Sequence, residues 1–104
     1  MALKITDSNI TETLKNNQIT VIDFWAEWCG PCRMLAPIIE ELSADNPDLA
    51  IGKLNVDENH ITTNQYGIRG IPAIFFFKDG VLVDRLVGMT QKDKLQAKID
   101  ALVG

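Results

Sequence analysis

The stretch of sequence that most constrains the fold is Ala26-Glu27-Trp28-Cys29-Gly30-Pro31-Cys32-Arg33-Met34, which holds both cysteines of the 104-residue chain. The run before it, residues 19–25, is rich in β-branched and aromatic side chains and is typical of a buried strand. The segment after it, residues 35–42, places apolar residues at helical spacing. We therefore expect the two cysteines to lie where a strand ends and a helix begins.

Cys29 stands at the expected start of this helix. Pro31 suits the first turn, because the N–H that proline lacks would have no helical partner there in any residue. The sulfur of Cys29 would face the free N–H groups and the positive end of the helix dipole, which favour a thiolate over a thiol. We expect Cys29 to be the attacking sulfur. Cys32, one turn further on and more buried, should lie close enough to form a disulfide with it.

Two other interpretations of the cysteine pair are open. A purely structural disulfide across so short a loop would remove little entropy from the unfolded chain. A zinc site needs about four ligands, and the one histidine, His60, lies in a separate segment. A redox-active dithiol at a strand–helix junction is the more specific interpretation, and we expect no metal.

Composition excludes several classes of function. A chain of 104 residues suits one domain spanning residues 1–104. A net charge of −4 without a basic cluster argues against a nucleic-acid partner. No apolar run is long enough to cross a membrane, and nothing near Met1 resembles a signal peptide. We expect a monomer in a reducing cytoplasm, with no membrane partner.

The remaining sequence predicts alternating strands and helices, which is typical of the α/β class with helices on both faces of a parallel sheet. A hairpin turn at Asp79-Gly80 should add one antiparallel strand. The expected strands are residues 3–6, 19–25, 49–56, 73–78 and 81–87. Four helices are expected. The first is capped by Asp7 or Ser8 and ends near Asn16, and the second spans residues 29–45. The third is the weakly patterned segment 57–66, and the fourth is capped by Thr90.

Asp23-Phe24-Trp25-Ala26, followed by Trp28-Cys29-Gly30-Pro31-Cys32, resembles the active-site signature of the thioredoxin family. The resemblance extends over essentially the whole chain. It implies the thioredoxin fold, a central mixed β-sheet flanked by helices on both faces. It also implies a protein-disulfide reductase that binds no cofactor, uses its own Cys29–Cys32 disulfide and acts on disulfide-containing client proteins. The electron source would be an NADPH-dependent flavoprotein, thioredoxin reductase.

Asp23 is the one carboxyl group in the strand 19–25, whose other residues are mostly apolar. It could lie at an edge and face water, or be buried with a raised pKa. The resemblance implies the buried state, with Asp23 exchanging a proton with Cys32. From the sequence pattern alone, Lys53 would be interpreted as a solvated charge at a strand edge. In the thioredoxin family a lysine at this place pairs with the buried aspartate, so the resemblance implies a contact between Lys53 and Asp23.

The resemblance also implies a substrate-binding rim around Cys29. In the family, the proline matching Pro72 follows a cis bond and faces the disulfide, so the backbone of Ile71 could pair with an extended peptide. Trp28 is expected at the rim and Trp25 in the core. The full set of rim residues is Trp28, Gly70, Ile71, Pro72, Gly88 and Met89, with Gly30 and Pro31 supporting the active site. Met89 and Gly70 stand where the family varies.

Two rival functions use the same features. A non-catalytic binding module would hold partners on the apolar rim, with the cysteines incidental. A dithiol oxidase or isomerase would use the same motif at a more oxidising potential. The pair Gly30-Pro31 between the cysteines resembles the reducing members of the family, so a reductase is the main hypothesis.

Overall fold

The computed structural model describes residues 1–104 and places one strand, β2, at the centre of a five-stranded sheet. Six of the seven residues of β2 are buried, so this strand is covered on both faces. The predicted elements are all present, with bounds that differ by a few residues. The strands are β1 (Leu3–Lys4), β2 (Ile19–Trp25), β3 (Ala50–Asn55), β4 (Ala73–Lys78) and β5 (Val81–Val87), and the helices are α1 (Ile10–Asn16), α2 (Gly30–Asp45), α3 (His60–Gln65) and α4 (Lys92–Val103).

The strand order is β1-β3-β2-β4-β5, which makes a mixed sheet. β3 runs parallel to β1 and β2, whereas β4 runs antiparallel to β2 and β5 antiparallel to β4. The expectation from element alternation that β4 would be parallel is therefore wrong. The six-residue α3 is about 9 Å long and cannot run back along a strand of about 20 Å. The chain instead enters β4 at Ala73, beside Phe24 near the end of β2.

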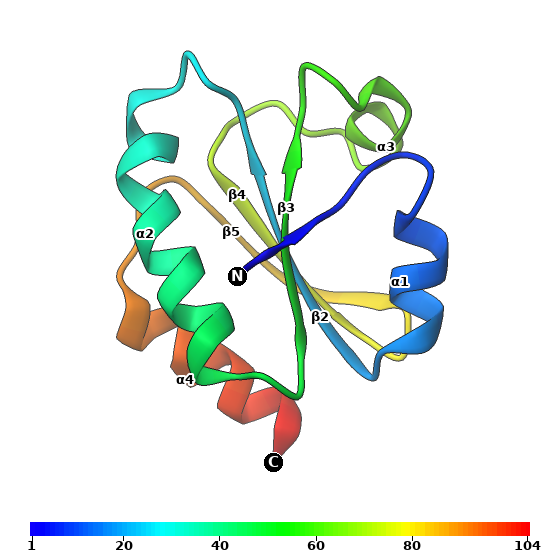
Figure 1. The fold of residues 1–104 in the computed structure, drawn as a ribbon, viewed down its shortest axis with the longest axis vertical. Helices are drawn as coiled ribbons and strands as arrows, with labels where there is room; N and C mark the ends of the chain where they lie inside the picture. The colour runs from blue at the N-terminus through cyan, green and yellow to red at the C-terminus, as the bar shows by residue number, and fades with distance from the viewer.

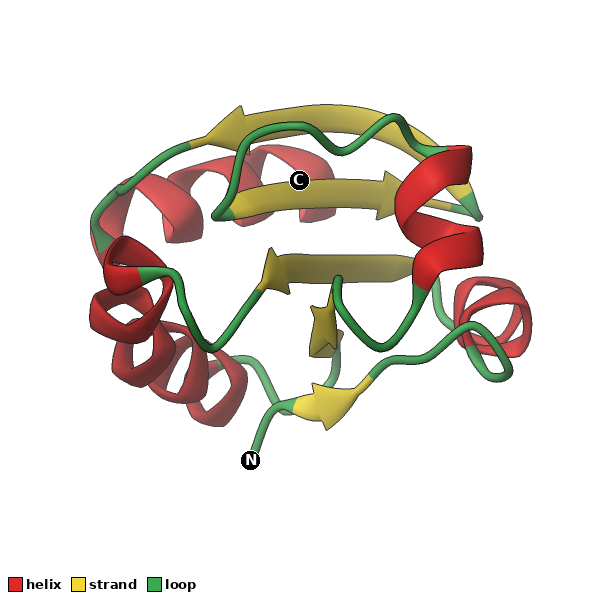
Figure 2. Ribbon diagram, turned by 90° about the horizontal axis from the view of Figure 1, so that it is seen from above, coloured by secondary structure: helices red, strands yellow, loops and turns green.

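Helices cover both faces of the sheet, as Figures 1 and 2 show, with α2 and α4 on one side and α1 and α3 on the other. Side chains alternate between these two layers along the strands. In β4, Phe76 packs in the layer of α2 and α4, and Phe75 and Phe77 pack in the layer of α1. Asp23 shares its face of β2 with Ile19 and Val21, so it points toward α2. None of the helices combines the length and apolar character needed to cross a membrane.

The predicted caps of α1 and α4 are wrong. Asn9, not Asp7 or Ser8, precedes α1, and no side chain caps this helix. The carboxylate of Asp7 instead accepts hydrogen bonds from the N–H groups of Ile61 and Thr62, at 3.3 and 2.9 Å. The loop before α1 lies against the start of α3, so the acid stabilises that more distant helix.

The second wrong cap is that of α4. Thr90 was predicted to precede the first residue of this helix, but α4 begins at Lys92, one residue later than that prediction implies. Gln91 is the residue before α4, and its side chain makes no capping hydrogen bond. The hydroxyl oxygen of Thr90 is buried and has no hydrogen-bond partner. The sequence therefore predicted the start of α4 to within a residue or two. Its prediction that the Thr90 side chain caps the helix is wrong.

Gly52 of β3 lies directly against β1, where there is no space for a larger side chain. A Cβ at this position would lie 2.6 Å from Cγ1 of Ile5 and 2.8 Å from the carbonyl oxygen of Leu3. Because the second atom belongs to the backbone, we predict that Gly52→Ala lowers the free energy of unfolding by about 1–3 kcal/mol. Urea melts would measure this. Gly30→Ala is the matched control, since no atom lies within 4 Å of its Cβ; equal stability of the two variants would contradict the packing of β1 on β3.

Candidate active site

Cys29 and Cys32 form a disulfide at the start of α2, with their Cα atoms 5.2 Å apart. Cys29 is the N-cap residue, Pro31 lies in the first turn, and the Cys29 sulfur accepts a hydrogen bond from the N–H of Cys32 at 3.2 Å. The sulfur therefore occupies the position at which free N–H groups and the helix dipole stabilise negative charge. Both residues are buried, at 4 % exposure for Cys29 and 1 % for Cys32, so the predicted difference in exposure exists but is small.

The loop before β4 and the loop after β5 meet beside the disulfide. The Ile71–Pro72 peptide bond is cis, and the carbonyl oxygen of Ile71 lies 3.8 Å from the Cys29 sulfur. The N–H of Gly88 donates to the carbonyl oxygen of Pro72 at 2.8 Å, which joins the two loops. Gly70 lies further along, where a Cβ would be 3.1 Å from a methyl group of Val87.

Two of the four apolar side chains predicted for the rim are exposed, whereas Ile71 is partly buried and Pro72 is buried. Trp28 is 68 % exposed and Met89 is 47 % exposed, whereas Ile71 packs partly against the two cysteines. Trp25, predicted for the core, is only partly buried. The structure therefore gathers apolar side chains around the disulfide, and Trp25 also packs against the two cysteines and lines a neighbouring pocket.

Asp57 is a site residue that sequence reasoning missed. It follows β3, and its carboxylate accepts a hydrogen bond from Nε1 of Trp28 at 2.9 Å. Its own N–H donates to the side-chain oxygen of Asn55 at 2.9 Å, which fixes the turn. The two partners lie 29 residues apart, and no local pattern connects them. Asp57 holds the exposed indole ring of Trp28 in place next to Cys29.

Asp23 is buried in the centre of the sheet with no partner for its charge. The residue is 1 % exposed, it takes part in no ion pair, and its Oδ1 has no hydrogen-bond partner. Burial raises the pKa of Asp23 to about 7, against the smaller lowering effect of the Lys53 charge. The alternative in which Asp23 faces water at a sheet edge is therefore wrong. This carboxyl group can therefore change its protonation near neutral pH.

Lys53 does not form the expected pair with Asp23, although the two are neighbours in the β2–β3 register. Its ammonium group lies 3.2 Å from Oε2 of Glu40 on α2 and 5.7 Å from the centre of the Trp25 ring. The hydrogen bond from the N–H of Ala2 lowers the pKa of Glu40, and Lys53 lowers it by a smaller amount. The Glu40 carboxylate therefore stays charged at a pH at which Asp23 is partly protonated. A fully charged, half-exposed carboxylate is the better partner for an ammonium group.

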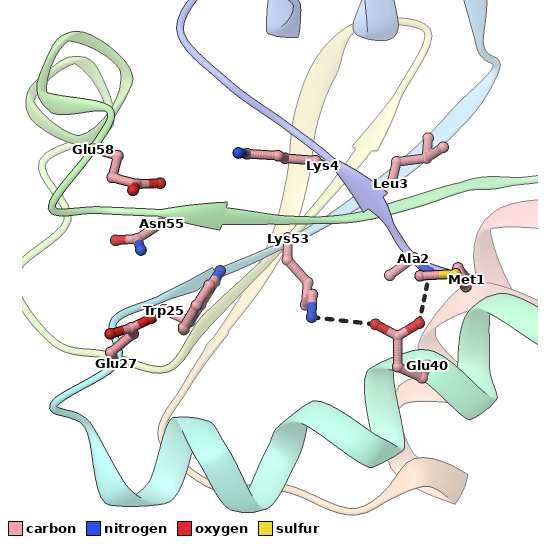
Figure 3. A pocket seen from close by; sticks show the side chains of 10 residues that line it. All are labelled: Met1, Ala2, Leu3, Lys4, Trp25, Glu27, Glu40, Lys53, Asn55 and Glu58. Atoms are coloured by element: carbon pink, nitrogen blue, oxygen red, sulfur yellow. Dashed lines mark hydrogen bonds and ion pairs between the residues drawn. The ribbon is translucent and has the colours of Figure 1, made fainter.

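Figure 3 shows these groups around a pocket of about 360 Å³ at the edge of the sheet. The Glu40 carboxylate lies between the N-terminal segment and the Lys53 ammonium group, and the Trp25 ring forms part of the wall. No three His, Cys, Asp or Glu side chains come together as a metal site. Sequence reasoning missed Glu40, because it is one of three acids in α2 and nothing local distinguishes it from the other two.

A disulfide at the start of a helix, a cis-proline loop beside it and a buried acid in the strand that leads into that helix form one constellation. The family model described as Thioredoxin matches residues 1–101. The chain belongs to the thioredoxin family. Thioredoxins are thiol–disulfide oxidoreductases that act in electron transfer with their own redox-active disulfide and need no cofactor. The chain is accordingly a protein-disulfide reductase, and disulfide-containing proteins are its substrates.

Similar thioredoxins agree with this assignment over nearly their full length. Thioredoxin 2 of Chlorobaculum tepidum is 48 % identical over 101 residues, which cover 95 % of this chain and 93 % of that protein. The thioredoxin of Alicyclobacillus acidocaldarius is 43 % identical over 98 residues, covering 93 % of each chain. The structure of a mutant thioredoxin from Halobacterium salinarum superimposes with a TM-score of 0.91 at 36 % identity, covering 99 % of this chain and 91 % of that one.

The raised pKa of Asp23 predicts how stability depends on pH. The unfolded carboxyl group, with a pKa near 3.8, loses its proton before the folded one, whose pKa is about 7. The free energy of unfolding of the wild type should therefore fall between these values, by about 4 kcal/mol in total, and stay lower above both. Asp23→Asn cannot ionise, so its stability advantage should grow from pH 4 to pH 8 in urea melts.

The control for this comparison is Asp48→Asn, which neutralises an exposed carboxylate and should follow the wild type at every pH. A stability difference between Asp23→Asn and the wild type that stays constant from pH 4 to pH 8 would show that the Asp23 carboxyl group is solvated.

The hydrogen bond from Trp28 to Asp57 predicts an effect on substrate binding. Asp57→Ala should raise KM for disulfide reduction with little change in kcat, because the indole ring loses its anchor. A net hydrogen bond of about 0.5–1.5 kcal/mol corresponds to a two- to tenfold loss in kcat/KM. Asp57→Asn keeps an acceptor oxygen for the Trp28 N–H and should therefore retain most of the wild-type kcat/KM. An Asp57→Ala variant with wild-type KM would show that the bond has no role in binding.

Proposed function

We propose that Cys29 is the attacking cysteine and Cys32 the resolving cysteine of this protein-disulfide reductase. The observation that carries the assignment is the position of Cys29 as the N-cap of α2, with its sulfur accepting the N–H of Cys32. A helix N-terminus stabilises the thiolate, which is the form that attacks a disulfide. Cys32 lies one turn inside the helix and lacks this advantage.

The reaction then has two exchange steps. In the reduced protein, the Cys29 thiolate attacks one sulfur of the substrate disulfide, forming a mixed disulfide and releasing the other substrate sulfur as a thiolate, which takes up a proton. The Cys32 sulfur then attacks the sulfur of Cys29, re-forming the Cys29–Cys32 disulfide and releasing the second substrate thiolate. One electron pair passes to the substrate, which leaves as a dithiol.

We infer that Asp23 takes the proton that Cys32 must lose before the second step. Asp23 lies on the face of β2 that points toward α2, with a pKa of about 7. A base whose pKa is near the working pH can both accept and release a proton in each cycle. Because its carboxylate has no fixed partner in the core, gaining a proton breaks no ion pair.

We propose that an extended segment of the substrate binds along the cis-proline loop. The backbone of Ile71 lies beside the Cys29 sulfur and can pair with such a segment as an added strand. Trp28, Met89 and Gly88 supply an apolar border, and Gly70 and Pro72 shape the loop. Gly30 and Pro31 support the site by starting α2, so that the Cys29 sulfur lies at its N-terminus.

Membership of the thioredoxin family supports a proposal for the partners and the setting. We infer that an NADPH-dependent flavoprotein, thioredoxin reductase, returns the electron pair to the Cys29–Cys32 disulfide. We also propose that the chain is a single domain, residues 1–104, that acts as a monomer in the cytoplasm, where thiols are kept reduced. We expect no nucleic-acid or membrane partner, since the net charge of −4 favours neither.

The two-step mechanism predicts that Cys32→Ser accumulates mixed disulfides with substrates, because the resolving sulfur is gone. The measurement is capture of client proteins from an oxidised lysate, release with dithiothreitol, and mass mapping of the bond to Cys29. Cys29→Ser is the matched control and should trap almost nothing. If instead Cys29→Ser traps clients through Cys32, the assignment of the two sulfurs is reversed.

A further inference from the structure

Glu40 is a charged residue of α2 to which the reaction described above gives no role. Its carboxylate is held at both oxygens: Oε1 accepts the N–H of Ala2 at 2.7 Å, and Oε2 lies 3.2 Å from Nζ of Lys53. Figure 3 shows the carboxylate facing Lys53 across the pocket edge. The residue is therefore fixed by two different parts of the chain and in turn fixes the Lys53 ammonium group.

Lys53 has a second anion close to it in the sheet. Lys53 and Asp23 are direct neighbours in the β2–β3 register, and both side chains lie on the face that points toward α2. Adjacent strands are about 4.8 Å apart, so a flexible lysine side chain could turn its ammonium group toward the Asp23 carboxyl group. In the structure it does not, because Glu40 holds it.

We propose that Glu40 is a positioning residue that keeps the Lys53 ammonium group away from Asp23 and so sets the pH at which Asp23 exchanges its proton. This inference rests on the proposed role of Asp23 as the proton acceptor for Cys32. The Glu40 carboxylate acts on Asp23 through Lys53: by holding the ammonium group, it limits how strongly that cation can stabilise the charged form of Asp23.

The surroundings of Asp23 leave Lys53 as the charge through which Glu40 acts. On the β4 side its register neighbour is Ile74, and α2 contributes the apolar residues Leu35 and Ile39 to this layer. Other charges line the pocket beside Lys53, and they are Lys4, Glu27 and Glu58. Among the charged groups, Lys53 is the one whose charge lowers the pKa of Asp23.

The test is the pH titration of the Asp23 side-chain carboxyl carbon by NMR in the oxidised protein, in which the cysteines do not titrate. Glu40→Gln keeps an acceptor for the Ala2 N–H and removes the charge. Its Asp23 midpoint should fall by about one pH unit relative to the wild type, since the released ammonium group can approach the carboxylate. Glu41→Gln, one residue along α2 and exposed, is the matched control and should leave the midpoint unchanged.

A double-mutant comparison separates positioning from a general charge effect. Lys53→Met should raise the Asp23 midpoint, and adding Glu40→Gln to it should produce little further change, because the cation that Glu40 holds is gone. An unchanged or raised midpoint in Glu40→Gln would overturn the inference. The inference would also be overturned if Glu40→Gln lowered the Asp23 midpoint as much in the Lys53→Met background as it does in the wild type.

Insulin reduction by the wild type and by Glu40→Gln distinguishes this inference from the proposed function. If both proteins reduce insulin but the Asp23 midpoint does not move in Glu40→Gln, only the positioning role of Glu40 is wrong. If Asp23→Asn reduces insulin as fast as the wild type while the midpoint does move, the proton-acceptor role of Asp23 is wrong and the effect of Glu40 on its titration stands.

Discussion

The burial of β2 on both faces is the constraint on which the rest of the structure depends. This strand lies between β3 and β4, and its apolar residues supply both halves of the core. The same burial keeps the Asp23 carboxyl group out of water without a partner, which raises its pKa to about 7. Where β2 ends, the chain turns directly into α2, and the turn puts the Cys29 sulfur at the helix N-terminus. One strand thus positions both the acid and the sulfur.

The features predicted correctly from the sequence are those that depend on neighbours in the chain. The 19–25 strand followed its β-branched residues, and the start of α2 followed from Pro31 and the spacing after it. The order of the strands in the sheet and the cis bond before Pro72 came only from the family resemblance, because no local pattern specifies them.

The features that sequence reasoning missed or misassigned are contacts between distant segments. Asp7 sits where it would cap α1, yet its carboxylate binds the start of α3, 54 and 55 residues away. Lys53 has two candidate anions, and only the packing of α2 against the sheet shows that Glu40 holds it. The direction of β4 depends on the path of the chain around α3, which alternation of elements does not specify.

The central claim is that the Asp23 carboxyl group is buried, unpaired and able to change its protonation at neutral pH. The most direct measurement is the titration of the Asp23 carboxyl carbon by NMR in the oxidised wild-type protein, with the resonance assigned by its loss in Asp23→Asn. The account predicts a midpoint at about pH 7. A midpoint close to 3.8, the ordinary value for a solvated aspartate, would contradict it.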